Sequence, residues 1–274
     1  MSTPTLTGKT PADLSFHPLR DSATMLRRNL RHMQRYPSMT VTLIGMPIVF
    51  LLLFVYVFGG TLGAGIDGTS SGRAEYVNYV TPAIILMTIA AAVQGTAISV
   101  AMDMTEGIIA RFRTMHIARV SVLTGHVLGS LVQTMLSIAA VLGVALLIGF
   151  RPTAGPGEWL TTAGFLIVVA FALIWLSVAL GLASKSVEAS SNVGMPLILL
   201  PFLGSGFVPT DSMPAGLRWF AEYQPFTSII ETLRGLLMGT PIGNHGWIAL
   251  GWCALIALGG YLWSKKLFNR EYTR

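Results

Sequence analysis

Charged residues are scarce in this sequence. Only 11% of its 274 residues are Asp, Glu, Lys or Arg, whereas about a quarter is usual in a soluble domain. Hydrophobic residues make up 53% of the chain. This balance excludes an ordinary soluble domain and predicts an integral membrane protein. No run of Lys and Arg interleaved with aromatic residues is present either, so we expect no nucleic-acid partner.

Cysteine and the usual signatures of catalysis are also missing. Cys253 is the single cysteine and lies in an apolar run, so no intrachain disulfide can form. The GLASKS stretch around Lys185 lacks the spacing of G-x-x-x-x-G-K-[ST], so the chain has no P-loop with which to bind ATP. G-x-S-x-G, H-E-x-x-H and a Cys/His cluster are absent as well. We therefore expect a non-catalytic chain with no cofactor or metal of its own.

Six apolar runs predict an all-α protein with six transmembrane helices. A helix needs about 20 apolar residues to cross about 30 Å of hydrocarbon. The predicted spans are residues 39–59, 79–102, 123–149, 159–183, 192–208 and 246–264. The fifth is short and carries Pro196 and Pro201, so we expect it to be kinked and packed inside the protein.

The spans contain no Asp, Glu or Lys of the kind that proton- or sodium-coupled carriers and intramembrane hydrolases usually bury. This absence indicates an energy source outside the chain. Two spans do contain uncharged polar residues. Interhelical hydrogen bonds, typically worth less than about 1 kcal/mol each, are one interpretation. The other is that Gln94, Gln133 and Thr134 line a path for an amphiphilic substrate.

Lys and Arg are distributed unevenly over the loops. If both termini are cytoplasmic, the outer segments hold only Arg73, Arg151, Arg218 and Arg234 of the 18 Lys and Arg residues. Asp and Glu show no such bias, so the pattern follows the positive-inside rule. We expect residues 1–17 to be a flexible tail, residues 18–37 to be a basic interfacial helix, and residues 265–274 to be a basic cytoplasmic tail.

Residues 103–119 form a charged amphipathic segment between the second and third spans. Five charges at about 2.5 to 3.5 kcal/mol each exclude this segment from the bilayer centre. Ile108, Phe112 and Met115 nevertheless share one helical face, which needs a partner to bury it. The segment therefore predicts a cytoplasmic helix that docks on another protein.

Residues 209–243, on the opposite side, predict two short amphipathic helices that break at Pro225. Glu231 and Arg234 are three residues apart, so we expect them to pair on one helix face. We interpret the pair as a helix-stabilising contact worth a few tenths of a kcal/mol, and favour this over a role in transport.

Two stretches resemble a known family. EGIIARFRTMHIAR, from Glu106 to Arg119, resembles the E-G-x-x-x-R-F/L-R/x-x-x-P-I-x-R signature of type-2 ABC exporter permeases, the ABC-2 family. FVPTDSMPAGLRWFAEYQPFTSIIETLRGLLMG, from Phe207 to Gly239, is similar to the outer region of the daunorubicin-resistance type of transmembrane subunit. His116 replaces a usual proline, and Ala110 replaces a residue that is often acidic in this branch.

The resemblance implies that residues 18–264 form one ABC-2 type transmembrane domain in the bacterial inner membrane. Two copies of the chain would dock on two copies of a separate ATPase, which binds ATP and Mg. Together they would export a lipophilic or amphiphilic compound, such as a drug, an antibiotic or a lipid, from the inner leaflet or the cytoplasm. A lipid-linked saccharide or glycolipid is an alternative cargo, and a proton-coupled multidrug carrier or a non-transporting sensor is an alternative function.

The resemblance also implies roles for individual residues. An outer gate is expected at Phe202, Phe207 and Phe226. Coupling to the ATPase is expected at Glu106, Gly107, Ile108, Arg111, Phe112, Arg113, Met115, His116 and Arg119. For Arg111 and Arg113, anchoring at the membrane surface remains an equal alternative.

Overall fold

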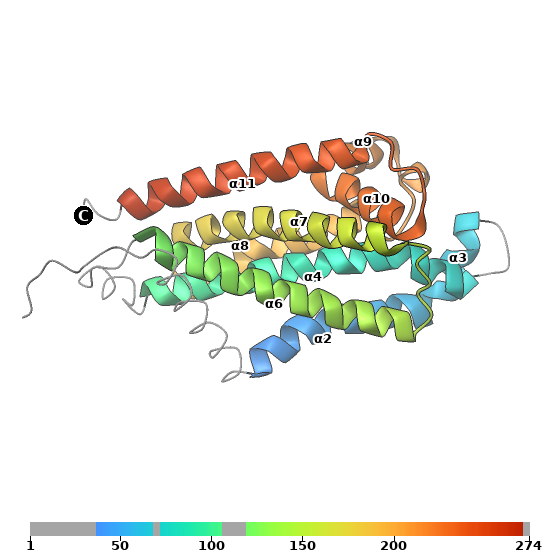
Figure 1. The fold of residues 1–274 in the computed structure, drawn as a ribbon, viewed down its shortest axis with the longest axis horizontal. Coiled ribbons are helices and arrows are strands. Elements are labelled where there is room, and N and C mark those ends of the chain that lie inside the picture. Colours follow the sequence, from blue (N-terminus) through green and yellow to red (C-terminus); the bar gives the residue numbers. More distant parts are fainter. Residues whose placement is uncertain (1–36, 68–71, 106–118, 271–274) are drawn as a thin grey trace, which may run out of the picture.

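The computed structural model describes residues 37–67, 72–105 and 119–270, and all regular structure within these ranges is helical (Figure 1). Long helices lie alongside one another. The chain leaves α4 (Gly72–Thr105) and enters α6 (Arg119–Leu147) at the end of the bundle where α11 (His245–Arg270) finishes. The short helices α3 (Gly59–Asp67), α9 (Ala215–Tyr223) and α10 (Pro225–Met238) lie at the opposite end.

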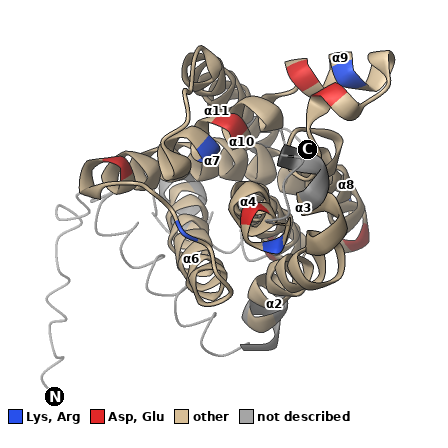
Figure 2. Ribbon diagram, turned by 90° about the vertical axis from the view of Figure 1, so that its right-hand side faces the viewer, with Lys and Arg blue, Asp and Glu red and all other residues tan. Residues whose placement is uncertain are grey.

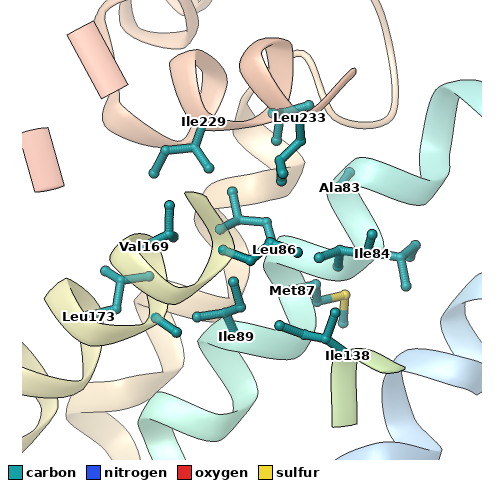
Figure 3. Close-up of a cluster of buried hydrophobic side chains, with 14 of the residues drawn as sticks. Ala83, Ile84, Leu86, Met87, Ile89, Ile138, Val169, Leu173, Ile229 and Leu233 are labelled. Carbon is teal, nitrogen blue, oxygen red and sulfur yellow. The ribbon is translucent and has the colours of Figure 1, made fainter. Parts of the chain in front are cut away.

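Helix α4 is the centre of the bundle. It packs against α6, α7 (Pro156–Ala183), α8 (Val187–Leu199) and α10, and almost every side chain from Tyr76 to Val93 is buried. Figure 3 shows how its apolar side chains meet those of three other helices. The cluster drawn there combines α4 with Ile138 of α6, Val169 and Leu173 of α7, and Ile229 and Leu233 of α10.

Glycines bring α7 close to its two neighbours. A Cβ on Gly181 would lie 2.7 Å from the carbonyl oxygen of Ala97 in α4, and a Cβ on Gly260 of α11 would lie 2.7 Å from the backbone of Trp175. Membrane helices associate through such small residues because apolar burial alone gives no preference over lipid. Helix α7 is therefore held between α4 and α11.

Local sequence explains where several helices begin and end. Helix α7 starts with Pro156, and the Glu158 carboxylate accepts a hydrogen bond from the backbone N–H of Gly155 at 2.7 Å. Helix α10 starts with Pro225 and ends at Gly239, whose φ of 68° is a left-handed conformation that suits glycine. Pro225 thus separates α9 from α10, as the spacing of the prolines predicts.

Five stretches of helix are long and apolar enough to cross a membrane in the described part of the chain. They are Leu43–Gly63, Gly72–Thr105, His126–Leu147, Pro156–Ala183 and His245–Leu267. The remaining predicted span, residues 192–208, corresponds to a shorter apolar helix, Val187–Leu203, which consists of α8 and a 3-10 turn (Leu200–Leu203). The chain is a multi-pass membrane protein.

Several predicted segments fall partly or wholly outside the described residues. The undescribed residues 1–36, 106–118 and 271–274 hold the predicted N-terminal tail, the last four residues of the predicted C-terminal tail, and most of the predicted interfacial and coupling helices. The described ends of these segments belong to the long helices. Helix α4 continues through Asp103 to Thr105, α6 begins at Arg119, and α11 continues to Arg270.

Candidate functional site

Four phenylalanines form an aromatic cluster between the first described helix and the segment that follows α8. Phe50 lies in α2 (Pro37–Leu53), and Phe54 opens the π-helical turn Phe54–Phe58. Phe202 lies just before the 204–207 turn, and Phe207 is its last residue. The rings of Phe202 and Phe207 stack with centroids 4.3 Å apart and planes at 3°, and Phe54 lies 4.5 Å from Phe207. The centroid of Phe50 is 5.9 Å from that of Phe202. The structure therefore joins two predicted gate residues.

The third predicted gate residue lies elsewhere. Phe226 is 1% exposed in α10 and belongs to the hydrophobic core, and the ring contacts found among the described residues do not include it. Sequence reasoning missed Phe50 and Phe54. Their spacing of four residues, which continues to Phe58, marks one helix face and was the signal available.

Two glycines allow the 204–207 turn to fold back closely enough for this stacking. A Cβ on Gly206 would lie 2.7 Å from the Cβ of Ala83 in α4, and a Cβ on Gly204 would lie 2.6 Å from Oγ1 of Thr227 in α10. The Tyr76 hydroxyl of α4 donates to the carbonyl oxygen of Phe207 at 3.4 Å. The turn is thus packed between α4 and α10.

A group of polar residues, here called the polar junction, lies beside this turn and comprises Tyr79, Ser205, Glu231 and Arg234. The Arg234 guanidinium contacts a Glu231 carboxylate oxygen at 2.6 Å and donates to the carbonyl oxygens of Ser205 at 3.0 Å and Tyr79 at 3.3 Å. Its Cζ lies 3.9 Å from the centroid of the Tyr79 ring. The Tyr79 hydroxyl donates to the same Ser205 carbonyl at 2.8 Å.

The predicted pairing of Glu231 with Arg234 is confirmed, and Arg234 also contacts segments outside its own helix. The two side chains are only 28% and 12% exposed, and Arg234 reaches α4 and the 204–207 turn as well as its own helix. The reason is that α10 packs this side of itself against α4. Spacing within one helix carries no information about such partners.

A second arginine, in α9, forms a contrasting group. Arg218 contacts Glu222 at 2.7 Å and Asp211 at 2.6 Å, and all three side chains are at least 43% exposed. Its hydrogen bond to Glu222 and its attraction to Asp211 raise the pKa of Arg218. Figure 2 shows charges of both signs on and beside α9, at the edge of an end of the bundle where other helices carry charges too.

Two of the three predicted path residues, Gln94 and Thr134, take part in helix packing. The Gln94 side chain of α4 donates to the carbonyl oxygen of Ser191 in α8 at 2.9 Å and packs against Gly194. Thr134 is fully buried, and its hydroxyl donates to Ser130 one turn earlier in α6 at 2.7 Å. Gln133 is half-buried on the same helix. The contact at Gln94 supports the interhelical interpretation for that residue.

Of the predicted coupling residues, only Arg119 lies within the described ranges, where it begins α6. The two helices that bracket the segment are joined by a contact between two side chains. His126 Nε2 of α6 lies 2.9 Å from Asp103 Oδ2 of α4, and both side chains are at most 15% exposed. This contact was not predicted from the sequence.

The sequence comparisons identify the family. Residues 21–238 match the family model described as ABC-2 type transporter. The chain belongs to the ABC-2 type transporter family. The resemblance noted from the sequence is therefore confirmed. The region matched to this family includes the aromatic cluster, the polar junction and the segment between α4 and α6.

Relatives of this ABC-2 chain carry names that refer to drug resistance. It is 28% identical over 222 residues to the daunorubicin resistance ABC transporter permease protein DrrB1 of Streptomyces coeruleorubidus, covering 79% of this chain and 75% of the relative. It is 26% identical over 246 residues to the probable doxorubicin resistance permease protein DrrC of Mycobacterium tuberculosis (strain ATCC 25618 / H37Rv), covering 86% and 85%. The doxorubicin resistance permease protein DrrB of that strain is 30% identical over 207 residues, covering 72% and 68%.

Proposed function

We propose that two copies of this ABC-2 chain form the membrane pathway of an ATP-driven exporter. The family match over residues 21–238 carries this proposal. Because the sequence has no P-loop, ATP and Mg would bind to a separate ATPase, present in two copies. The chain would lie in the bacterial inner membrane with both termini in the cytoplasm, as its Lys and Arg distribution predicts.

The substrate would be a lipophilic or amphiphilic compound that is taken from the inner leaflet or the cytoplasm and released outward. The relatives named for daunorubicin and doxorubicin resistance support this substrate class. The composition of the pathway agrees with it, because Phe50, Phe54, Phe202 and Phe207 offer aromatic surface to a passing apolar molecule. We assign the role of outer gate to this aromatic cluster.

The chain would cross the membrane six times, with Val187–Leu203 as the fifth span. The 13 residues of α8 rise by about 20 Å at 1.5 Å each. The four residues of the 3-10 turn add about 8 Å at 2.0 Å each. The sum is close to the hydrocarbon thickness of about 30 Å. Pro201 favours this change of helix type because it has no N–H to donate.

Force from the ATPase would enter through the segment between α4 and α6. Closure of the ATPase dimer would press on this segment, in which the sequence places Ile108, Phe112 and Met115 on one face. The contact between Asp103 and His126 ties the two helices together at the base of the segment. A push on the segment would therefore move α4 and α6 as a unit, and α4 contacts the turn that carries Phe207.

Replacing Phe112 with Asp tests this coupling. The buried face expected at Phe112 would then carry a charge that must be desolvated, so the ATPase should no longer co-purify with the chain and transport should be lost. Phe112→Leu is the matched control, because it keeps the apolar surface and should retain both. Co-purification and transport at the original level in Phe112→Asp would show that the coupling assignment is wrong.

A further inference from the structure

We propose that Arg234 is a positioning residue for the outer gate: it fastens the 204–207 turn to α4 and so keeps the Phe202–Phe207 stack closed. This inference rests on the proposed function, because it assigns a regulator to the gate of the proposed pathway. Arg234 has the most partners of any side chain in the polar junction. Arg234 contacts its own helix at Glu231, helix α4 at Tyr79 and the turn at Ser205.

The Ser205 carbonyl oxygen is the point at which these contacts meet. It accepts hydrogen bonds from the Arg234 guanidinium at 3.0 Å and from the Tyr79 hydroxyl at 2.8 Å. A hydrogen bond from a charged donor is about twice as strong as a neutral one, and a poorly hydrated site strengthens it further. Two donors from α10 and α4 therefore hold one carbonyl of the turn.

Ser205 is two residues from Phe207, so the position of this carbonyl governs the position of the stacked ring. The turn is fixed at two further points, since the Ser205 N–H donates to Thr227 Oγ1 at 3.4 Å and Tyr76 donates to the Phe207 carbonyl at 3.4 Å. If the turn moves away from α4, it carries Phe207 away from Phe202. Such movement must first break the two bonds to the Ser205 carbonyl.

Glu231 allows the Arg234 guanidinium to be buried beside the turn and to bind it. A buried guanidinium without a counter-charge is costly, and the Glu231 carboxylate at 2.6 Å provides one within the same helix. The planar guanidinium has donors on more than one edge. Pairing with Glu231 through Nη1 therefore leaves Nη2 to donate to Ser205 and Tyr79. A lysine ammonium would keep the charge but not this fork.

Buried polar groups without hydrogen-bond partners lie next to the turn, and they lower the free-energy cost of moving the turn away. Both polar atoms of the Gln224 side chain and the Ser205 hydroxyl are buried and have no hydrogen-bond partner in the described part of the chain. Gln224 lies against the turn, because a Cβ on Gly204 would be 2.7 Å from its Nε2. Lifting the turn would expose these groups to partners and offset part of the loss at Ser205.

The test uses the chain assembled with its ATPase in proteoliposomes that are loaded with carboxyfluorescein at a self-quenching concentration, without ATP. If Arg234 holds the gate shut, Arg234→Met should release the dye about fivefold faster, as expected for the loss of about one net hydrogen bond. Tyr79→Phe removes only the hydroxyl and should give about a twofold increase. Arg218→Met is the matched control and should leave release unchanged.

A disulfide distinguishes a held turn from a general weakening of the fold. Ser205→Cys and Thr227→Cys are combined with Cys253→Ser and Arg234→Met, because Ser205 and Thr227 are in contact across the turn and α10. Oxidation should restore slow dye release, and a reductant should reverse the effect. Fast release that persists after verified oxidation would overturn the proposal.

Other outcomes are equally decisive. Wild-type release rates in a folded Arg234→Met complex would contradict the role of Arg234. If that variant does not assemble, Arg234→Lys and Tyr79→Phe take its place, and unchanged release in both would also contradict it. Failure of the proposed export function can be distinguished from failure of the Arg234 role. In the first case the wild-type complex would not transport doxorubicin with ATP, regardless of how fast the variants release dye.

Discussion

Helices α9 and α10 follow one another in the chain and carry the same kind of charged pair in different surroundings. Arg218 and Glu222 are four residues apart in α9 and are 45% and 43% exposed. Glu231 and Arg234 are three residues apart in α10 and are 28% and 12% exposed. In α9 the pair stays at the surface, whereas in α10 it joins three segments of the protein.

The apolar residues of each helix explain this difference. In α9 only Ala221 is buried, so nothing draws the helix against the bundle. In α10, Ile229, Ile230 and Leu233 are at most 1% exposed and belong to the hydrophobic core, in which Figure 3 shows Ile229 and Leu233. Burial of these residues brings Arg234 to Tyr79 and Ser205. The role of an ion pair is thus decided by the residues around it rather than by its spacing.

Breaking the buried pair should have the largest effect. Arg234→Met leaves the Glu231 carboxylate without its partner and should lower the free energy of unfolding by about 2 to 3 kcal/mol, somewhat less than for a fully buried pair. Thermal unfolding of the purified chain measures this loss. The double variant Glu231→Gln/Arg234→Met should recover part of it, because no lone charge remains. Equal losses in the single and double variants would contradict the explanation.

A smaller effect is expected at the aromatic cluster, which the buried pair positions. Phe207→Leu keeps most of the apolar volume but removes the stacked ring, so it should cost about 0.5 to 1.5 kcal/mol. It should also reduce substrate-stimulated ATP hydrolysis in the assembled complex. Phe226→Leu is the control, since Phe226 lies in the core away from this stack. A loss of coupling in Phe226→Leu alone would reverse the assignment.

Gln94 extends the comparison to an uncharged side chain. Gln94→Leu removes the hydrogen bond to Ser191 and should lower stability by less than about 1 kcal/mol. Gln133→Leu should have a weaker effect still. Transport assays of the double variant decide whether these residues line the pathway. An unchanged rate and an unchanged range of substrates would leave Gln94 with a packing role only.

The smallest effect is expected at the exposed pair. Arg218→Met should leave the melting temperature unchanged within error, because water and salt already screen its contacts with Asp211 and Glu222. Repeating the measurement at high ionic strength adds a second check. The difference in melting temperature between the wild type and Arg218→Met should stay at zero within error. A loss comparable to that of Arg234→Met would remove the contrast between α9 and α10.

The sequence predicted much of the helical framework because its signals are local. Long apolar runs located the long helices, and Pro225 marked the start of α10. The predicted helix boundaries were less accurate where a helix continues through polar residues. Arg73 and Glu75 look like loop residues, but they belong to α4, which begins at Gly72. The 192–208 run was expected to be short, and its 3-10 end follows from Pro201.

The candidate site was harder to predict because its contacts join distant parts of the chain. Phe202 and Phe207 were expected at a gate, but Phe54 reaches them from about 150 residues earlier. The link between Tyr79 and Arg234 spans 155 positions, and no local pattern indicates it. Asp103 and His126 lie on either side of the proposed coupling segment and meet only after α4 and α6 have packed.

The central claim is that this chain has no energy source of its own and exports substrate only when a separate ATPase drives it. Doxorubicin uptake into inside-out proteoliposomes tests this most directly, with protein-free liposomes as the baseline. We predict uptake above the baseline only when the chain, its ATPase, ATP and Mg are all present. Uptake by the chain alone under an imposed pH gradient, above that of protein-free liposomes under the same gradient, would contradict the claim.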